Sequence, residues 1–156
     1  MSVVIRTRDT GMAAFLKRLT SPEVTVGVHS ADGSQVEEGS DITVAEIAAI
    51  HEFGLGVPER SWLRAFVDEN RDELSDMLAA TAKLIAQGKY PADVAMNRFG
   101  LAVVGMVKKR IVAGIEPGLA ESTKAEKMRV TGGNAKDTPL IRFGQFISAI
   151  AHEVSR

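Results

Sequence analysis

The chain has 156 residues, of which 45% are hydrophobic and 25% are charged, with no cysteine and a formal net charge of −1. A chain of this length buries about 68 to 70% of its unfolded surface, so residues 1–156 are expected to form one domain without a stabilising metal or disulfide. Thiol chemistry is excluded, a strongly basic nucleic-acid binder is disfavoured, and the apolar runs are too short to cross a bilayer. No secretory signal opens the sequence, so synthesis inside the cell is expected.

The first two predicted elements are an amphipathic helix and a strand. Residues 1–22 carry apolar side chains at helical spacing, with Lys17 and Arg18 on the other face and Pro22 at the end. The apolar positions are Met12, Phe15, Leu16 and Leu19. Valines alternate with other residues over 23–29, which is the period-two pattern of a half-buried strand.

Residues 31–41 are rich in glycine, serine and acidic side chains, which predicts an exposed loop. After it, Thr43 and Glu46 have the spacing of a capping box, so a short helix is expected to begin at Thr43 and to end at Gly54. Trp62 follows a proline-led turn and precedes further apolar residues. It is therefore predicted to be a packing anchor at the start of the next helix.

Two long amphipathic helices are predicted next, one from Ser61 to Gly88 and one from Pro91 to Gly114. Each has a continuous apolar stripe, and the short connection predicts that they pack as an antiparallel hairpin. Their apolar faces exceed what two helices can cover mutually, so part should lie against a sheet. The predicted fold is α+β, with a small antiparallel sheet packed against these two helices and some shorter ones.

The C-terminal part divides into an irregular segment and a strand. Residues 115–139 show no sustained period, which predicts a long loop of the kind that is either functional or disordered. Leu140–Arg156 is predicted to begin with a short helical turn and to close as a strand beside residues 23–29.

His51-Glu52 and His152-Glu153 raise the question of a metal site, but their spacing does not fit one. A HExxH helix needs a second histidine four residues after His51, and Leu55 stands there instead. No GxSxG motif, cysteine nucleophile or phosphate-binding glycine loop is present either. The sequence therefore predicts no metal, no cofactor and no enzymatic activity. His51 and Glu52 are interpreted as hydrogen-bonding groups that contact a loop or a neighbouring subunit.

Basic residues cluster at the end of the second long helix, in Lys108, Lys109 and Arg110. Two interpretations stay open for them: a favourable interaction with the negative end of the helix, or a patch that faces DNA in a channel. In residues 115–139 basic and acidic side chains balance four to four, which favours contact with another subunit over contact with DNA. The basic ones are Lys124, Lys127, Arg129 and Lys136, and the acidic ones are Glu116, Glu121, Glu126 and Asp137.

Two separated blocks carry a resemblance to a known family. The first is IAAIHEFG, a glycine-containing loop and VPERSWLR, within residues 43–64, and the second spans residues 119–154 and contains TPLIRFGQFISAI. In this order they resemble the signature of the virion morphogenesis proteins of tailed bacteriophages, which act in tail completion or in the neck between head and tail. The chain departs from that family at Arg142-Phe143, where relatives usually have Asp-Thr before the glycine.

The resemblance implies a structural virion protein, assembled in the host cytoplasm, that forms a ring, commonly a hexamer, around the DNA channel. The implied partners are copies of itself, head-tail connector or neck proteins and tail tube proteins, with packaged DNA touched without sequence specificity and no membrane. A ring needs a heterologous contact between subunits. The candidate contact residues are His51, Glu52, Phe53, Arg60, Trp62, Arg64, Lys124, Lys127, Arg129, Arg142 and Phe143, and the candidate channel residues are Lys108, Lys109 and Arg110.

The alternative is a DNA-binding module of a phage or prophage, built on the short helix and its turn into the next. A helix-turn-helix would need basic or amide side chains exposed at the start of that second helix. Arg60, Arg64 and Asn70 qualify. The acidic residues around them, which are Asp68, Glu69, Asp72 and Glu73, oppose this interpretation. A small hydrolase, a third class, lacks any motif.

Overall fold

The computed structural model describes residues 22–36, 41–130 and 144–155, except for the side chains of Glu126, Lys127 and Val130. The amphipathic helix predicted before Pro22 lies outside the described residues. So do the candidate contact residues Arg142 and Phe143 and the side chain of Lys127.

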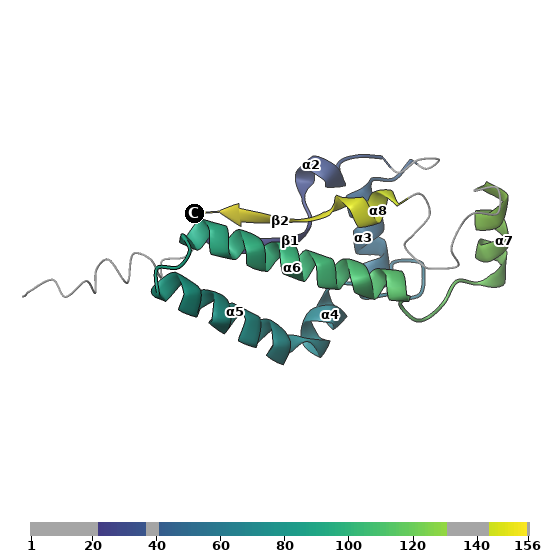
Figure 1. The fold of residues 1–156 in the computed structure, drawn as a ribbon. Helices are drawn as coiled ribbons and strands as arrows, with labels where there is room; N and C mark the ends of the chain where they lie inside the picture. Colours follow the sequence, from purple (N-terminus) through teal and green to yellow (C-terminus); the bar gives the residue numbers. More distant parts are fainter. Residues whose placement is uncertain (1–21, 37–40, 131–143, 156) are drawn as a thin grey trace, which may run out of the picture.

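The described chain is a mixed α+β protein, which confirms the predicted class. Its elements in order are β1 (Glu23–Val28), α2 (Ser30–Gly33), α3 (Val44–Phe53), α4 (Arg64–Glu69), α5 (Arg71–Ala86), α6 (Ala92–Ala113), α7 (Glu121–Val130), α8 (Gln145–Ala149) and β2 (Ile150–Ser155). In Figure 1, α6 runs along the middle of the molecule, with the sheet on one side and α5 on the other. Helix α7 stands apart, beyond the end of α6.

The sheet consists of β1 and β2, which pair antiparallel from Glu23 opposite Ser155 to Val28 opposite Ile150. This arrangement confirms that the C-terminal segment forms a helical turn, α8, followed by a strand beside the first one. The alternation that predicted β1 reflects its burial, because Val24 and Val26 are half-buried while Glu23 and Thr25 are exposed.

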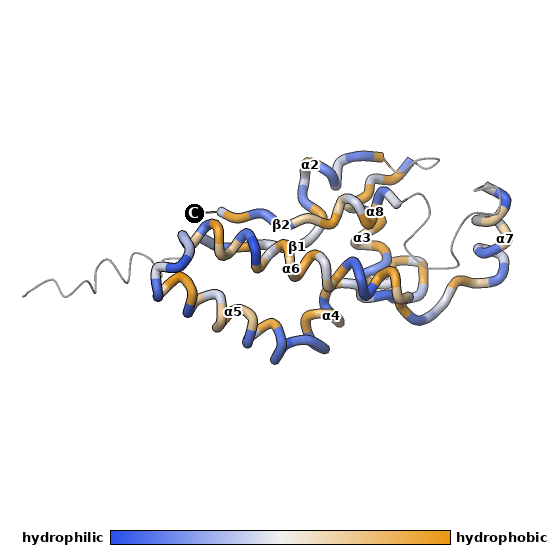
Figure 2. Tube along the Cα trace, viewed as in Figure 1, coloured by the Kyte–Doolittle hydropathy of each residue, from blue (hydrophilic) through white to orange (hydrophobic). Residues whose placement is uncertain are grey.

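Helix α6 packs across both strands and carries much of the core. Its buried positions are Ala95, Met96, Gly100, Val103, Val104, Val107 and Ile111. The main core is completed by Trp62, by Phe66 of α4, and by Phe146 and Ile150 near the C-terminus. In Figure 2 apolar residues recur along α6. The core therefore joins the middle helix to segments from both halves of the chain.

At Gly100 the backbone of α6 comes close to side chains of both strands of the sheet. A Cβ atom at Gly100 would lie 2.5 Å from Cδ2 of His152 and 2.9 Å from a methyl group of Val24. His152 is held in place because its Nε2 lies 2.8 Å from the side-chain oxygen of Asn97 on α6. Only a residue without a side chain fits this contact unless the strand or the histidine moves.

The predicted helix from Ser61 to Gly88 is interrupted at Asn70, where the structure has two helices, α4 and α5. Asn70 has φ −113° and ψ 19°, and its side-chain amide donates to the carbonyl oxygen of Phe66 at 2.8 Å. Asparagine competes with helical hydrogen bonds in this way. Figure 2 shows that this junction is strongly hydrophilic. The prediction of two long antiparallel helices is therefore not confirmed, although α6 itself forms over 22 residues.

Two segments predicted to be loops contain regular structure. Within residues 115–139, Glu121–Val130 forms α7, so the prediction of a wholly irregular segment is wrong there. Helix α7 has no apolar face, which is why a search for hydrophobic periodicity misses it. Within residues 31–41, α2 and a bridge between Val36 and Thr43 replace part of the predicted loop.

Replacing Gly100 with alanine should lower the free energy of unfolding by about 1–3 kcal/mol, because the added methyl overpacks the contact with His152. Gly105→Ala is the matched control on the same helix, since a methyl group added there would have no atom within 4 Å. It should be neutral or stabilise the protein by up to about 1 kcal/mol, because alanine favours helix. Denaturant unfolding of both variants checks this. Equal stability of the two variants would contradict the close packing of Gly100 against His152 and Val24.

Candidate functional site

The short helix α3 places a glutamate at the start of a turn. It begins with the predicted capping box, in which the Thr43 side chain accepts from the Glu46 N–H and the Glu46 carboxylate accepts from the Thr43 N–H. It ends at Gly54, whose φ of 66° confirms the predicted left-handed stop. Glu52 therefore lies in the last turn of α3, and its side chain points at the chain that follows.

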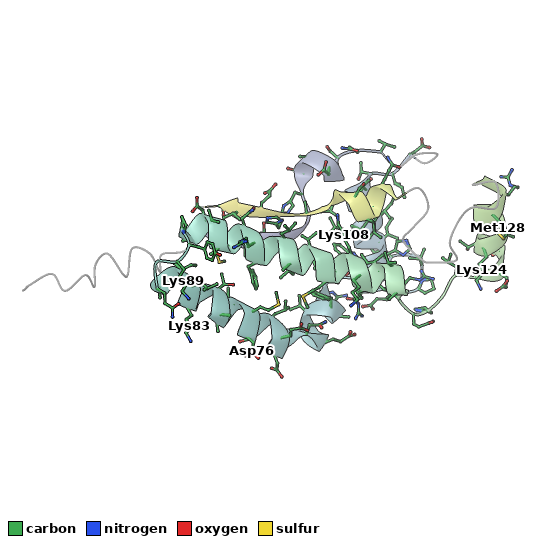
Figure 3. The ribbon with its side chains drawn as sticks, viewed as in Figure 1. Asp76, Lys83, Lys89, Lys108, Lys124 and Met128 are labelled. Atoms are coloured by element: carbon green, nitrogen blue, oxygen red, sulfur yellow. The ribbon has the colours of Figure 1, made fainter. Side chains whose placement is uncertain are left out.

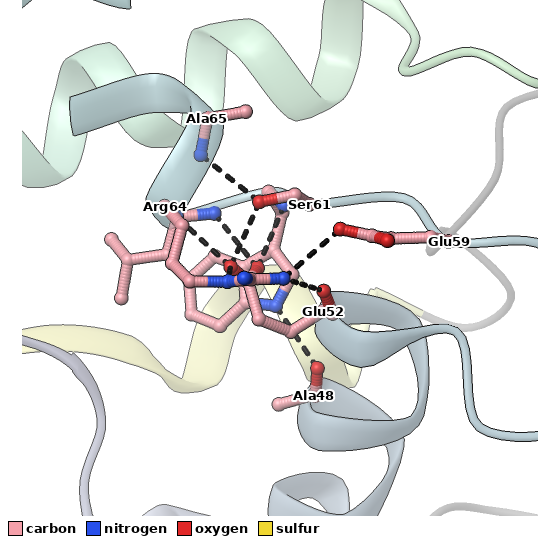
Figure 4. Close-up of polar contacts among 8 residues, drawn as sticks. Ala48, Glu52, Glu59, Ser61, Arg64 and Ala65 are labelled. Atoms are coloured by element: carbon pink, nitrogen blue, oxygen red, sulfur yellow. Dashed lines mark hydrogen bonds and ion pairs between the residues drawn. The ribbon is translucent and has the colours of Figure 1, made fainter. Parts of the chain in front are cut away.

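The carboxylate of Glu52 is buried and accepts five hydrogen bonds from residues 61–64 (Figure 4). The backbone N–H groups of Trp62, Leu63 and Arg64 donate at 2.9, 3.0 and 2.9 Å. The Ser61 hydroxyl and the Arg64 Nε donate at 2.9 and 3.0 Å. The carboxylate thus satisfies N–H groups at the start of α4 that have no partner within that helix, and its negative charge is favourable there.

These donors also determine the protonation of Glu52. Burial alone would raise the pKa of this carboxyl, but the hydrogen bonds from the Arg64 and Leu63 backbone and from the Ser61 and Arg64 side chains together outweigh burial and hold the pKa below its usual value. Because the lone pairs of the carboxylate are engaged by these five donors, it has little capacity left to exchange a proton with a substrate. The geometry indicates a structural role for Glu52.

Arg64 and Ser61 extend the network outward. The Arg64 Nη2 donates to the backbone oxygen of Glu52 at 2.7 Å and to the Glu59 carboxylate at 3.0 Å, and its guanidinium lies 4.8 Å from the ring centroid of Phe53. The Ser61 hydroxyl accepts from the Ala65 N–H at 2.9 Å, so it satisfies one backbone donor in the first turn of α4, although the N-cap residue of that helix is Leu63.

Trp62 is 4% exposed, which confirms the prediction that it is a packing anchor. Its indole N–H donates to the carbonyl oxygen of Ala48 at 3.1 Å. Its ring meets Phe146 of α8 edge to face, with centroids 5.2 Å apart and an interplanar angle of 89°. Trp62 and Phe146 belong to the two sequence blocks that carry the family resemblance, so these blocks are in direct contact.

Arg60 is also buried, and it binds a segment distant in sequence. Its Nε and Nη2 donate to the carbonyl oxygens of Pro117 and Gly118 at 2.7 and 2.9 Å. Its own N–H donates to the carbonyl oxygen of His51 at 2.8 Å. Arg60 therefore ties the end of α3 to the connection that leads into α7.

His51 lies beside this arginine. Burial of the imidazole, and secondarily the charge of Arg60, lower the pKa of His51 to about 4. Its Nδ1 is buried, with no hydrogen-bond partner among the described residues. His51 is therefore neutral at physiological pH.

The other candidate residues differ in their exposure and in whether they form ion pairs. Phe53 is 56% exposed, and Lys124 on α7 forms an ion pair with Glu121 at 2.8 Å. Arg129 is exposed on the same helix. Arg110 forms an ion pair with Glu69 through both of its terminal nitrogens, so this cation is engaged within the protomer. Lys108 is half-buried and Lys109 is exposed on α6.

Sequence reasoning missed two features of this region. Leu55 and Val57 are 58% and 36% exposed, so together with Phe53 they place three exposed apolar side chains within residues 53–57, hereafter the 53–57 loop. Their apolar character within a glycine-containing loop was an available signal. The partners of Arg60, in contrast, lie 57 and 58 residues away and left no local signal.

Within the described residues, no three acidic or histidine side chains are grouped as metal ligands, and no helix is both long and apolar enough to cross a bilayer. The fold and site thus define a mixed α+β protein in which a buried carboxylate binds residues 61–64, and Trp62 of that segment packs against Phe146 of the second sequence block. Comparison with protein-family models, curated proteins and solved structures found no significant match.

Replacing Glu52 with glutamine should lower the free energy of unfolding by about 2–3 kcal/mol, because the new amide NH₂ faces N–H donors and the charge-assisted bonds are lost. Glu59→Gln is the control, since Glu59 is exposed and reaches only the outer nitrogen of Arg64. That exposed pair contributes about 0–1 kcal/mol. Chemical denaturation of both variants measures the difference. A cost for Glu52→Gln no larger than that for Glu59→Gln would contradict the role given to the carboxylate.

Stability should fall on acidification in two steps. The folded-state pKa of His51, about 4, lies below its value of 6.5 in the unfolded chain, so its contribution is complete above pH 6.5 and is lost as the pH falls towards 4. The pKa of Glu52 is also lowered, so its contribution is complete above about pH 4.5 and is lost below that. His51→Gln should therefore flatten the pH dependence between 6.5 and 4.5 and leave the acid limb intact. Thermal melts across pH 3–8 test this, and identical slopes in both proteins would contradict it.

Proposed function

We propose that this protein is a structural component of a tailed bacteriophage virion, acting in tail completion or in the neck as a homo-oligomeric ring around the DNA channel. The observation that carries the proposal is the contact between Trp62 and Phe146, together with the Glu52 network. The two sequence blocks that resemble the morphogenesis proteins are separated by more than fifty residues, yet they form one buried unit. This supports the resemblance, because a chance match of two short patterns has no reason to converge in space.

A ring needs a rigid surface on one subunit that fits a different surface on its neighbour. The 53–57 loop suits the first role. Gly54 and Gly56 have positive φ angles of 66° and 76°, and the Arg60 N–H holds the end of the loop to His51. The loop therefore presents Phe53, Leu55 and Val57 on a fixed base, and solvent-exposed apolar groups of this kind favour burial against a partner.

Helix α7 suits the second role. It stands away from the body of the protein in Figures 1 and 3, and its Met128 is 57% exposed. Arg60 anchors the connection at Pro117 and Gly118, so the base of this arm is held while the helix projects. Within the proposed ring, α7 with Lys124, Lys127 and Arg129 reaches a neighbouring subunit or the connector.

Lys108 and Lys109 are the remaining candidates for a DNA-facing surface. Figure 3 shows Lys108 on the side of α6 that faces away from α5. Two lysines per subunit, repeated around a ring, would give a weakly basic lining, which suits passage of DNA without sequence readout. The acidic start of α5 gives no comparable support to the alternative of a sequence-specific DNA-binding module.

The oligomeric state of the purified protein tests the proposal. Native mass spectrometry and electron microscopy should show a closed ring with a central channel, alone or after addition of tail tube protein. Phe53→Asp and Leu55→Asp should each raise the dissociation constant between subunits about tenfold or more, because a charge replaces a buried contact. Leu101→Asp is the control, since Leu101 is 61% exposed on α6, far from the loop in the chain.

Circular dichroism should show that all three variants are folded. A protein that stays monomeric in both conditions and binds a defined duplex sequence would overturn the ring and establish the DNA-binding module instead.

A further inference from the structure

An apolar groove, hereafter the α5–α6 groove, lies between α5 and α6. It has a volume of about 270 Å³ and is lined mainly by apolar side chains, including Met77 and Leu84 of α5 and Ala95, Phe99 and Ala102 of α6. In Figure 1 the two helices are close at their common turn and separate towards α4. Ala102 is exposed, so the groove is open to the surface.

Helix α5 is poorly covered for its composition. Of its sixteen residues, Ile85 is the one that the described part of the chain buries, while Leu74, Met77 and Leu84 are half-buried. Most of the stability of a helix in a folded protein comes from packing of its apolar face. The groove side of α5 therefore lacks a partner among the described residues.

The 53–57 loop is an apolar projection that fits this groove in size. Leu55 is 58% exposed, and Phe53 is 56% exposed with the Arg64 guanidinium over its ring. A cavity of about 150 Å³ is enough to hold a benzene molecule. The α5–α6 groove, at about 270 Å³, therefore has room for the Leu55 side chain and for part of the Phe53 ring.

The loop is also compact. A Cβ atom at Gly54 would lie 3.0 Å from the Cβ of Glu59, so the chain closes back on itself across the loop. The Arg60 N–H then donates to the carbonyl oxygen of His51 at 2.8 Å. Because both ends of the loop are held together, Leu55 stays close to the end of α3.

The loop and the groove of one chain lie at different ends of α6. The groove is lined by α6 from Ala95 to Ala102. Arg60, which follows the loop, binds the carbonyl oxygen of Pro117, beyond the C-terminal end of α6 at Ala113. From Ala102 to Ala113 the helix rises about 16.5 Å at 1.5 Å per residue. A chain's own loop therefore does not reach its own groove, whereas the loop of a second copy can.

Charge at the two surfaces is complementary. Arg98 lines the groove, and among the described residues it contacts the Tyr90 ring and makes no ion pair. Glu59 follows the loop, and its exposed carboxylate bonds to Arg64 through Oε1. An acidic group beside the loop and a basic group in the groove wall steer the two surfaces together and fix how they align.

We propose that the 53–57 loop of one copy docks in the α5–α6 groove of the next copy, with Leu55 in the groove and Glu59 beside Arg98 at its edge. This inference rests on the proposed ring and names one of its subunit contacts, separate from that of α7. The two surfaces differ and every copy has both, so the contact is heterologous. Repeated from copy to copy, it closes into a ring when the rotation between neighbours allows.

The absence of cysteine from the sequence makes a direct test possible. In Val57→Cys/Ala80→Cys, which keeps Leu55, each copy has one cysteine on the loop and one in the groove. Docking should bring their Cα atoms within the roughly 7 Å that a disulfide tolerates, so mild oxidation should give a ladder of linked multimers on a non-reducing gel. Val57→Cys/Ala79→Cys is the matched control, because Ala79 is an exposed alanine of the same helix that does not line the groove. The control should run as a monomer.

Charge reversal is the second measurement. Arg98→Glu and Glu59→Arg should each raise the dissociation constant between subunits by about threefold to tenfold, and Glu59→Arg/Arg98→Glu should return it to within about twofold of the original protein. Glu59→Arg/Arg71→Glu is the control, since Arg71 is exposed on α5 and does not line the groove. This control should restore nothing. Sedimentation velocity measures all four variants.

The outcomes separate this contact from the ring itself. Equal linking through Ala79 and Ala80 overturns the contact, as does a ring in native mass spectrometry whose Ala80 pair stays unlinked and whose charge reversal is not restored. The proposed function then stands. Linked dimers without higher multimers also overturn the contact, since two copies then pair the same surfaces. A protein that stays monomeric at every concentration, alone and with tail tube protein, removes both the contact and the proposed ring.

Discussion

The rest of the structure depends on the buried carboxylate of Glu52. Removing a carboxylate from water costs several kcal/mol unless donors replace the lost solvent, and five donors from residues 61–64 do so. Three of these donors are consecutive backbone N–H groups, so the carboxylate fixes the backbone path from α3 into α4. It also holds the side chains of Ser61 and Arg64 in place. Once that path is set, Trp62 faces the core and Arg64 faces the surface.

The segment that Glu52 holds is flanked by two surface features, the 53–57 loop and the connection to α7. The turn that Glu52 holds presents the apolar side chains of the 53–57 loop on one side. On the other, Arg60 uses its guanidinium to hold the backbone at Pro117 and Gly118, from which α7 projects. A rigid centre with an exposed apolar loop and a projecting helix is an arrangement suited to assembly, because the contact surfaces keep their relative positions before a partner arrives.

Helix α6 links this centre to the sheet and to α5. One face meets β1 and β2 so closely at Gly100 that the His152 ring occupies the space of a side chain. A neighbouring face forms the groove with α5. A helix with apolar residues on more than one face is typical of a layer enclosed on two sides. In this protein the sheet covers one apolar face of α6, and the second apolar face lines the pocket between α5 and α6.

The sequence by itself determined the features that depend on neighbouring residues. The capping box at Thr43 and Glu46, the left-handed stop at Gly54, the alternating strand at 23–28 and the burial of Trp62 follow from local hydrogen bonding, backbone sterics and apolar spacing, and the structure has all four.

Only the tertiary structure decided the break at Asn70, the helix at 121–130 and the partners of Glu52 and Arg60. Helix α7 has no apolar period to detect, and the Asn70 amide can bond to water as well as to a carbonyl, so the sequence does not select between them. Arg60 pairs with carbonyl groups nearly sixty residues away, and such a contact exists only after the chain has folded, so no spacing in the sequence records it.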